Sequence, residues 1–273
     1  KRLDLGLDTR LNAKVGLLSG GQRQALTLLM ATLTKPRLLL LNKADMADPS
    51  ATSRWIAAYR KQGFVALGMD CRSGKGVSNF VPAVREQLLP ALLEKRAAHG
   101  MTGAPIRLMV VGIPNVGKSS FINRMAQSKR AKVEDRPGVT RTKQWVKIGS
   151  NMELLDMPGV LWPKFDDQTV AQKLAFTGAI NDDVMDLEAL ACLLLQRLAV
   201  SYPKALEERY RMTDLQAIQE DGFAMLELLG RKRGMLISGG EVNTERAAIT
   251  LLDEFRSGKL GRITLELPEQ EAL

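Results

Sequence analysis

The sequence predicts an α/β domain, with a mainly parallel sheet flanked by helices, followed by a small all-helical domain. Three observations support this prediction. Short apolar runs at residues 38–41, 64–69 and 106–111 have the length expected of buried strands. A glycine-rich loop at residues 112–119 stands between the third run and a helical pattern. Beyond about residue 178, apolar residues recur at helical spacing.

The remaining elements follow from apolar spacing and from turn residues. The spacing predicts helices over residues 53–62, 79–98 and 119–125 in the first domain. It predicts a hairpin there as well, with strands at residues 143–148 and 152–156 around a Gly-Ser-Asn turn. In the second domain we expect helices at residues 186–200, 212–229 and 243–257.

The loop at residues 112–119, hereafter the phosphate loop, reads Gly-x-x-x-x-Gly-Lys-Ser and lies between a strand and a helix. In that context the motif cradles the phosphates of a nucleoside triphosphate, with help from the helix dipole. Lys118 is expected to reach the β- and γ-phosphates, and Ser119 to bind Mg²⁺. A glycine-rich turn before an ordinary helix is the alternative, but it does not explain why every fixed position is filled. The expected phosphate contacts are Asn115, Val116, Gly117, Lys118, Ser119 and Ser120.

Residues 42–45, the base-reading loop, read Asn42-Lys43-Ala44-Asp45 and follow the first apolar run. The Asp45 carboxylate can accept two hydrogen bonds from the ring N–H and amino group of guanine, and adenine lacks that donor pair. The stem of Lys43 can lie over the base, and Asn42 can tie this loop to the phosphate loop. A helix cap is the alternative for such a short match. Its place at a strand end, in a chain with a phosphate loop, favours guanine recognition.

Three further loops complete the expected site. Asp156 follows a strand and is expected to bind Mg²⁺ through water, while the Gly159 N–H contacts the γ-phosphate. Between the phosphate loop and Asp156 lies a loop with a candidate Mg²⁺-binding hydroxyl, Thr140, and Thr142 is the alternative. Residues 70–75, the Cys71 loop, can offer the backbone N–H of Cys71 to the guanine carbonyl.

The order of these loops is informative, because the base-reading loop and the Cys71 loop precede the phosphate loop. Ordinary small GTPases have the opposite order. From about residue 35 nearly to its end, the chain resembles the circularly permuted GTPases, and the ribosome biogenesis GTPase A family most closely. Further matching residues are Pro137-Gly138-Val139-Thr140, Asp156-Met157-Pro158-Gly159-Val160-Leu161-Trp162-Pro163, Arg246-Ala247-Ala248 and Gly258-Lys259-Leu260-Gly261-Arg262-Ile263.

The resemblance implies a circularly permuted P-loop GTPase domain at residues 35–177 and a helical domain at residues 178–273 that contacts ribosomal RNA. It implies a GTP-binding and GTP-hydrolysing switch in assembly of the large ribosomal subunit, with GTP or GDP and Mg²⁺ as ligands. The expected partners are the large-subunit precursor and its rRNA, without membrane or DNA. Lys118, Thr140 and Gly159 would then be the catalytic residues.

Two features bear on hydrolysis. Asn115 resembles an Asn of potassium-stimulated GTPases that helps to hold K⁺, so K⁺ is a candidate ligand. Many GTPases place a Gln after the Asp-x-x-Gly box to orient the attacking water, and this chain has Val160 there. An alternative function is therefore a GTP-binding, rRNA-associated protein with impaired hydrolysis.

The first 34 residues resemble another family. Residues 18–26 are similar to the signature motif of ABC-transporter ATPases, and their sequence is Leu-Ser-Gly-Gly-Gln-Arg-Gln-Ala-Leu. The alternative is that Ser19-Gly20-Gly21 simply caps a helix. An ABC-type ATPase subunit is a third interpretation, but that family has Asp-Glu where this chain has Asn42-Lys43. The resembled GTPases carry a His-containing segment and a central strand in this region. Residues 2–8 alternate charge and Leu, so we expect the sheet to be weakened or poorly completed at its centre.

The composition limits the kinds of partner, compartment and metal site that the chain can have. A formal charge of +9 and a pI of about 9.7 suit a polyanionic partner, whether RNA, DNA or an anionic membrane. No apolar stretch reaches the roughly 18–20 residues that span a bilayer, and no export signal is recognisable, so we expect a cytoplasmic protein. Two Cys and one His give neither a disulfide framework nor a zinc site.

Overall fold

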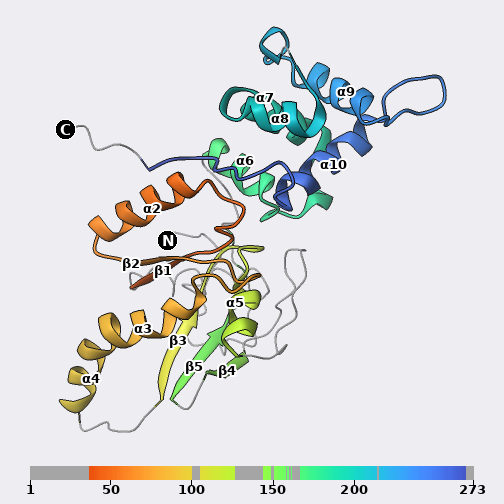
Figure 1. The fold of residues 1–273 in the computed structure, drawn as a ribbon. Helices are drawn as coiled ribbons and strands as arrows, with labels where there is room; N and C mark the ends of the chain where they lie inside the picture. The colour runs from red at the N-terminus through yellow and green to blue at the C-terminus, as the bar shows by residue number, and fades with distance from the viewer. Residues whose placement is uncertain are drawn as a thin grey trace. The chain divides into compact units, whose positions relative to one another are not determined.

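The computed structural model describes residues 37–99, 105–126, 144–148, 151–157, 159, 161, 167–213 and 215–268. These residues form two compact units, which Figure 1 shows as a part with strands and a part made of helices. The helical unit comprises residues 167–266 together with residues 46–48. The ABC-like segment at residues 1–34 and the loop that carries Thr140 lie outside the described residues.

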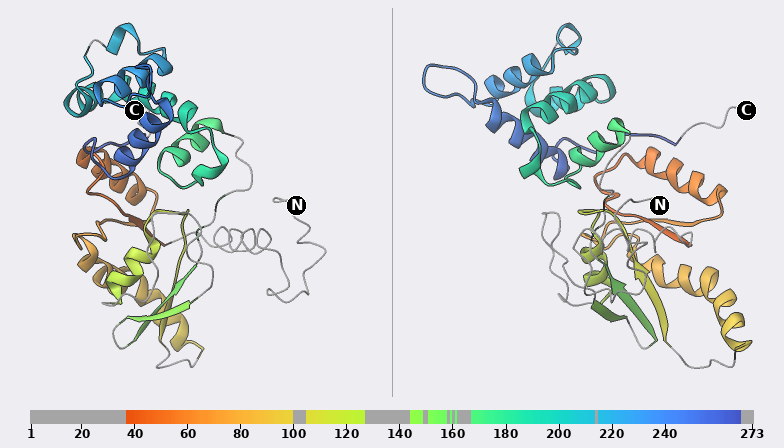
Figure 2. Two further views of the ribbon diagram at one scale, coloured as in Figure 1. Left: turned by 90° about the vertical axis from the view of Figure 1, so that its right-hand side faces the viewer. Right: turned by 180° about the vertical axis from the view of Figure 1, so that it is seen from behind.

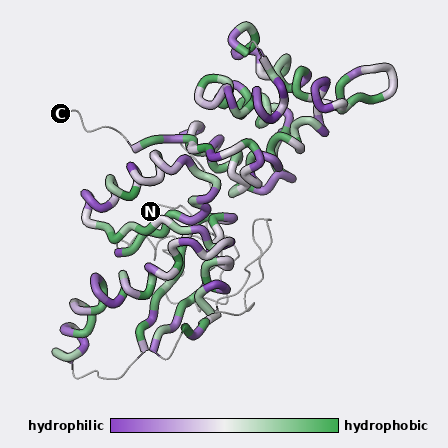
Figure 3. Tube along the Cα trace, viewed as in Figure 1, coloured by the Kyte–Doolittle hydropathy of each residue, from purple (hydrophilic) through white to green (hydrophobic). Residues whose placement is uncertain are grey.

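The first unit begins with a strand–helix–strand motif. Strand β1 (Leu38–Leu41) pairs in parallel with β2 (Val65–Gly68), so that Leu38 lies opposite Val65. The four leucines of β1 form a continuous apolar run, green in Figure 3. Helix α2 (Pro49–Lys61) connects the two strands and packs on β2. It begins four residues before the predicted helix at 53–62, because Pro49 already has the backbone angle that a first helical turn requires.

The second sheet carries the phosphate loop. Strand β3 (Ile106–Val110) pairs in parallel with β5 (Met152–Asp156), and β4 (Gln144–Ile148) pairs antiparallel with the other edge of β5. This confirms the predicted hairpin. Helix α5 (Lys118–Met125) follows the phosphate loop, as predicted.

The strands of the described ranges form two separate sheets, in the orders β1–β2 and β3–β5–β4. The expectation of a sheet weakened at its centre depends on residues 2–8, which lie outside the described residues, so it stays a prediction. Both sheets share one apolar core, in which Met69 and Leu154 are almost completely buried. Phe80 and Phe121 meet edge to face in that core, with ring centroids 4.9 Å apart. Side-chain packing thus joins the two sheets where backbone pairing is not seen.

One predicted helix of this unit is irregular. Residues 79–98 form a short 3₁₀ turn (Val77–Asn79), α3 (Phe80–Ala83), a π-helical turn (Val84–Leu88) and α4 (Leu89–Ala97). Pro90 has no N–H to donate to the carbonyl four residues earlier. Just before Pro90, the Leu89 N–H therefore bonds to the Val84 carbonyl oxygen five residues earlier, which makes one π-helical turn.

The second unit is all-helical, as predicted. Its helices are α6 (Gln168–Phe176), α7 (Leu187–Ser201), α8 (Pro203–Tyr210), α9 (Gly222–Lys232) and α10 (Thr244–Arg256), with short 3₁₀ turns at Asp182–Val184 and Leu215–Ala217. Helices α7, α9 and α10 pack against one another, as all views in Figures 1 and 2 show. Their contact faces are apolar and fully buried, with Leu194, Met225 and Leu251 at 0% exposure. No helix among the described residues is long and apolar enough to cross a membrane.

The prediction of one helix at residues 212–229 is wrong. Arg211 adopts a left-handed conformation, with φ at 57°, which ends α8. The next long helix starts only at Gly222, where the Asp221 side chain accepts a hydrogen bond from the Ala224 N–H. Apolar spacing alone did not reveal these two boundaries.

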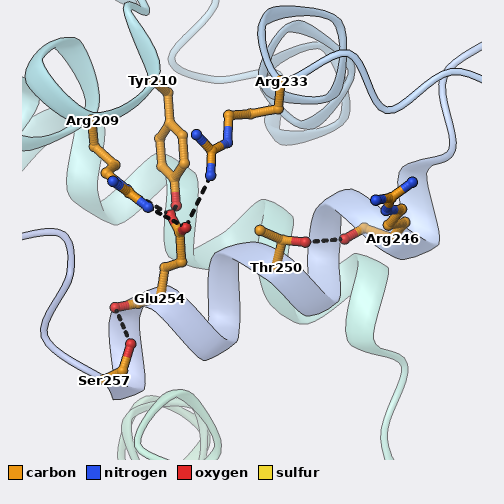
Figure 4. Close-up of polar contacts among 7 residues, drawn as sticks. All are labelled: Arg209, Tyr210, Arg233, Arg246, Thr250, Glu254 and Ser257. Carbon is orange, nitrogen blue, oxygen red and sulfur yellow. Dashed lines mark hydrogen bonds and ion pairs between the residues drawn. The ribbon is translucent and has the colours of Figure 1, made fainter.

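A buried ion cluster lies between α8, α9 and α10 (Figure 4). Glu254 is only 5% exposed, and its carboxylate accepts hydrogen bonds from Arg209, from Arg233 at 3.1 Å and from the Tyr210 hydroxyl at 2.8 Å. The Arg233 guanidinium also lies over the Tyr210 ring, 5.8 Å from its centroid. The buried Glu254 carboxylate is thus paired with the buried Tyr210 hydroxyl and with two arginines whose side chains are about one third exposed.

Candidate nucleotide site

The phosphate loop joins β3 to α5, and its backbone is shaped by residues with positive φ. Gly117 has φ at 91° and forms the N-cap of α5. A Cβ at Gly117 would lie 2.2 Å from Nδ2 of Asn42, so no larger residue fits there. Asn115 also has positive φ, at 59°. The loop therefore curls tightly before the helix, in the form that turns backbone N–H groups toward an anion.

Lys118 is the first residue of α5 and is 9% exposed. Its ammonium donates hydrogen bonds to the carbonyl oxygens of Gly112 and Ile113, at 2.9 and 2.8 Å. The side chain thus folds back over the phosphate loop. Burial lowers the pKa of Lys118 to about 8, although the nearby Asp156 carboxylate acts in the opposite direction. A buried ammonium held only by carbonyls is well placed to bind an incoming anion.

Asp156 ends β5 and is completely buried. Among the described residues, neither of its carboxylate oxygens has a hydrogen-bond partner. Burial raises its pKa, and the charge of Lys118 opposes that rise. Two unsatisfied oxygens of a buried acid are costly, unless a cation or an ordered water binds them. The donor chemistry and the lack of partners therefore fit Mg²⁺, which prefers oxygen ligands.

Gly159 brings the Asp-x-x-Gly segment against the phosphate loop. A Cβ at this position would lie 2.8 Å from Cα of Pro114, so the two backbones are in close contact. Only glycine permits that approach. A Gly159 N–H next to the phosphate loop can therefore contact the last phosphate of a bound nucleotide.

The base-reading loop is connected to the phosphate loop through Asn42. Its Nδ2 donates to the carbonyl oxygen of Val116 at 2.8 Å, and its Oδ1 accepts from the Cys71 N–H at 3.1 Å. Ala44 donates its N–H to the Met69 carbonyl oxygen at 3.1 Å. The predicted tie between these loops is thus present, and one amide side chain joins three loops.

The other two members of the base-reading loop remain accessible. Lys43 has φ at 58°, which turns the chain sharply after Asn42. Asp45 is exposed. An exposed carboxylate beside an anchored loop is free to meet a ligand from solvent.

The Cys71 loop is closed by Asp70. Its carboxylate accepts hydrogen bonds from the N–H groups of Arg72 at 2.7 Å and Ser73 at 3.1 Å. Burial raises the pKa of Asp70, but the hydrogen bonds from Ser73 and Arg72 outweigh it and hold the pKa below its usual value. Gly74 then completes the turn, with φ at 92°. The loop is a rigid unit that places the Cys71 N–H beside Asn42.

Sequence reasoning did not identify Arg124, in the last turn of α5. Its Nη2 donates a hydrogen bond to the Arg72 carbonyl oxygen at 3.0 Å. A Cβ at Gly74 would lie 2.7 Å from the same nitrogen, so the guanidinium lies directly against the Cys71 loop. No sequence pattern reveals this contact, because its acceptor is a backbone carbonyl 52 positions away.

The remaining expected residues fall into two groups. Ser119 and Ser120 lie in the first turn of α5, half-buried beside Lys118. Thr140, its alternative Thr142 and Val160 lie outside the described residues. Within the described ranges, no group of three His, Cys, Asp or Glu side chains could hold a metal ion by itself. A metal here would accordingly depend on Asp156, hydroxyl groups and the nucleotide.

The chain is similar to known proteins over most of its length. The sequence matches the 50S ribosome-binding GTPase family over residues 107–219. Ribosome biogenesis GTPase A of Priestia megaterium is 44% identical over 236 residues, which cover 86% of this chain and 81% of that protein. The protein of the same name from Thermotoga maritima is 28% identical, covering 86% of this chain and 78% of the relative.

Two solved structures have a similar fold. A GDP-bound structure of YlqF gives a TM-score of 0.58 at 26% identity, covering 85% of this chain and 84% of that one. A GNP-bound structure of YlqF from T. maritima gives 0.53 at 26% identity, with coverage of 85% and 82%.

Proposed function

Because this chain belongs to the ribosome biogenesis GTPase A family, we propose that it binds and hydrolyses GTP as a switch in assembly of the large ribosomal subunit. One observation carries the proposal most strongly. Asn42 connects a loop that suits guanine to a loop that suits phosphates, with bonds to Val116 and Cys71. Asn42 therefore holds the loop for the base and the loop for the phosphates together, so that one nucleotide can contact both.

At the base end, the exposed Asp45 accepts the ring N–H and the amino group of guanine. The stem of Lys43 covers the base. The Cys71 N–H, which donates to Asn42 Oδ1 in this structure, is shared with the guanine carbonyl when the nucleotide binds. Adenine has no matching donor pair, so its binding would leave the Asp45 carboxylate unpaired. The proposed specificity is therefore for guanine.

At the phosphate end, the N–H groups of residues 115–120 and the ammonium of Lys118 bind the β- and γ-phosphates. Lys118 exchanges its bonds to Gly112 and Ile113 for bonds to phosphate oxygens. Gly159 contacts the γ-phosphate from its position against Pro114. These contacts stabilise charge that develops on the phosphates as the terminal bond breaks.

Mg²⁺ would be held by Ser119, by Asp156 through water, and by Thr140. When bound, it would supply positive charge that offsets the negative charge of the phosphates. Asn115 is the proposed K⁺ contact, and its positive φ turns the chain next to the phosphates. The rate of GTP hydrolysis measured in K⁺ and in Na⁺ tests that assignment. We expect faster hydrolysis in K⁺, and equal rates would contradict the assignment.

Val160 favours a second candidate function, GTP binding with slow turnover. The side chain at this position cannot orient a water by hydrogen bonding, as a Gln does in many GTPases. Hydrolysis would then depend on another group, supplied by this chain or by a partner. Under this candidate the nucleotide still switches the protein between two states, but release from the ribosome is slow.

The proposed partner is a precursor of the large ribosomal subunit, contacted through its rRNA in the cytoplasm. The net charge of +9 suits a polyanion, and the helical unit exposes the basic residues Arg231 and Lys232 in the last turn of α9. A solvated charged face is the alternative explanation for these residues.

A hydrolysis assay distinguishes the two functions. GTP turnover is measured with and without purified large ribosomal subunits, using K118M as a negative control. The primary proposal predicts turnover that ribosomes stimulate at least tenfold and that K118M loses. GTP binding without turnover under both conditions would favour the second candidate. Absence of guanine-nucleotide binding would contradict both.

A further inference from the structure

The base and phosphate ends of the candidate site lie on different sheets. The base-reading loop and the Cys71 loop extend from β1 and β2, whereas the phosphate loop and Asp156 extend from β3 and β5. In the described part of the chain, no strand pairing connects the two sheets. Among the described residues, side-chain contacts connect the two ends of the site.

Asn42 and Arg124 both make such a connection, at opposite ends of α5. Asn42 binds the carbonyl oxygen of Val116, two residues before the start of the helix. Arg124 lies in the last turn of the helix and binds the Arg72 carbonyl oxygen in the Cys71 loop at 3.0 Å. The phosphate-binding helix is thus attached to the base-binding loops at both of its ends.

We propose that Arg124 is a positioning residue for guanine recognition, one that fixes the Cys71 loop on the phosphate-binding helix. This inference rests on the proposed binding of guanine nucleotides. By holding Arg72 in place, Arg124 sets the distance from the Cys71 N–H to the phosphate loop. A nucleotide of fixed length then meets both ends of the site at once.

The internal bonds of the Cys71 loop make it able to transmit this restraint. Asp70 accepts from the N–H groups of Arg72 and Ser73, and its own N–H donates to the Lys75 carbonyl oxygen at 2.9 Å. These three hydrogen bonds connect Arg72, Ser73 and Lys75 to Asp70. A restraint applied at Arg72 acts on Cys71, and through the bond from Cys71 to Asn42 it acts on the base-reading loop.

The shape of the guanidinium suits this task. Nη2, Cζ and Nε of Arg124 would lie 2.7, 3.0 and 3.1 Å from a Cβ at Gly74, so the planar group lies along the loop backbone. Glycine is required at this position both for its positive φ and for that close approach. A lysine ammonium is a compact point charge and cannot reproduce a planar contact with a neighbouring hydrogen bond.

A variant pair tests the proposal in the full-length protein. Arg124→Met keeps the apolar stem but removes the donor. Arg60→Met is the matched control, because Arg60 is also an exposed arginine of this unit that donates to a backbone carbonyl, that of Ala66 at 3.2 Å. Affinities are measured for GDP, for inosine diphosphate, which lacks the 2-amino group, and for inorganic pyrophosphate.

We expect R124M to bind GDP about tenfold more weakly, as the loss of one hydrogen bond from a charged donor implies. Inosine diphosphate should lose affinity to a similar extent, because it keeps the carbonyl that the Cys71 N–H meets. Pyrophosphate affinity should change less than about twofold, and R60M should match wild type in all three. Thermal unfolding shows whether both variants are folded.

The outcomes separate this proposal from the function on which it rests. If wild type binds GDP and R124M binds it as tightly as wild type does, Arg124 has no positioning role. An equal loss of GDP and pyrophosphate affinity in R124M would assign Arg124 to general support of α5 instead. Wild-type protein that does not bind GDP would overturn the proposed function as well.

Discussion

The side-chain amide of Asn42 donates a hydrogen bond to the carbonyl oxygen of Val116 at 2.8 Å, and these residues are 74 positions apart. The bond links the base-reading loop to the phosphate loop. The same side chain accepts the Cys71 N–H, so it also links the third loop of the site. Asn42 is therefore the residue on which the relation between the base end and the phosphate end depends most.

Asn42→Ala should weaken GDP binding by a factor of about 10 to 100, since two hydrogen bonds at about 1 kcal/mol each are lost and Cys71 is left without its acceptor. Titration with fluorescent GDP measures the loss. Asn79→Ala is the control, because Asn79 makes no side-chain cap bond in this unit. Equal affinity of N42A and wild type would show that the loops do not need this connection.

Lys118→Met should reduce GDP affinity about 100-fold, through loss of a charged hydrogen-bond donor to the phosphates. The folded protein should not lose stability in proportion, because burial already disfavours the charged ammonium and lowers its pKa to about 8. Nucleotide titration and thermal unfolding together measure the two effects. A variant that binds normally would remove Lys118 from the site, and an unfolded one would show that its bonds to Gly112 and Ile113 are structural.

Asp156→Asn should stabilise the nucleotide-free, magnesium-free protein at pH 7 by about 1–2 kcal/mol, because a buried carboxylate without partners becomes a neutral amide. Added Mg²⁺ and GDP should stabilise wild type more than the variant. Urea unfolding with and without Mg²⁺ checks both expectations. Glu94→Gln, at an exposed position on α4, controls for the change in net charge. If D156N is less stable than wild type without Mg²⁺, the carboxylate has a partner in the free protein.

Glu254→Gln should destabilise the helical unit by about 2 kcal/mol at pH 7, because the charged bonds to Arg209 and Arg233 are lost. Hydrogen bonds from Arg209 hold the pKa of Glu254 below its usual value. The contribution is therefore complete above the unfolded pKa and is lost as the pH falls through the folded one. The difference between variant and wild type should shrink as the solution is acidified below about pH 4.5.

Hydrogen exchange of α7 and α10 amides measures this effect within the full chain. Glu208→Gln, on the exposed face of α8, is the control and should exchange like wild type. A difference between E254Q and wild type that persists unchanged at pH 3 would contradict the assignment of the effect to the ionised carboxylate.

The sequence was sufficient to predict the loops of the site but not all of the contacts between them. The motif around Lys118 specifies a strand, a loop and a helix within a few residues, so local rules identify it. The tie from Asn42 was predicted as well, because the phosphate loop limits what that amide can bind. Arg124 was missed, since its partner is a backbone carbonyl that becomes adjacent only in the folded chain.

The helical unit shows where periodicity fails. Apolar spacing predicted a helix at residues 212–229, but Arg211 and Asp221 interrupt the pattern with a left-handed residue and a cap. Helices α6 and α8 were not predicted, although Asp167 and Pro203 occupy positions typical of a helix start. The Glu254 cluster draws on three helices, so no single stretch of sequence indicates it.

The central claim is that this chain forms a guanine-specific nucleotide site. In its sequence the base-reading loop and the Cys71 loop come before the phosphate loop, the reverse of the order in ordinary small GTPases. Parallel titrations with fluorescent GDP and fluorescent ADP test it most directly, with Asp45→Asn as the control. The account predicts tight GDP binding, at least 100-fold weaker ADP binding, and loss of that preference in D45N. Binding of neither nucleotide, or stronger binding of ADP than of GDP, would contradict it.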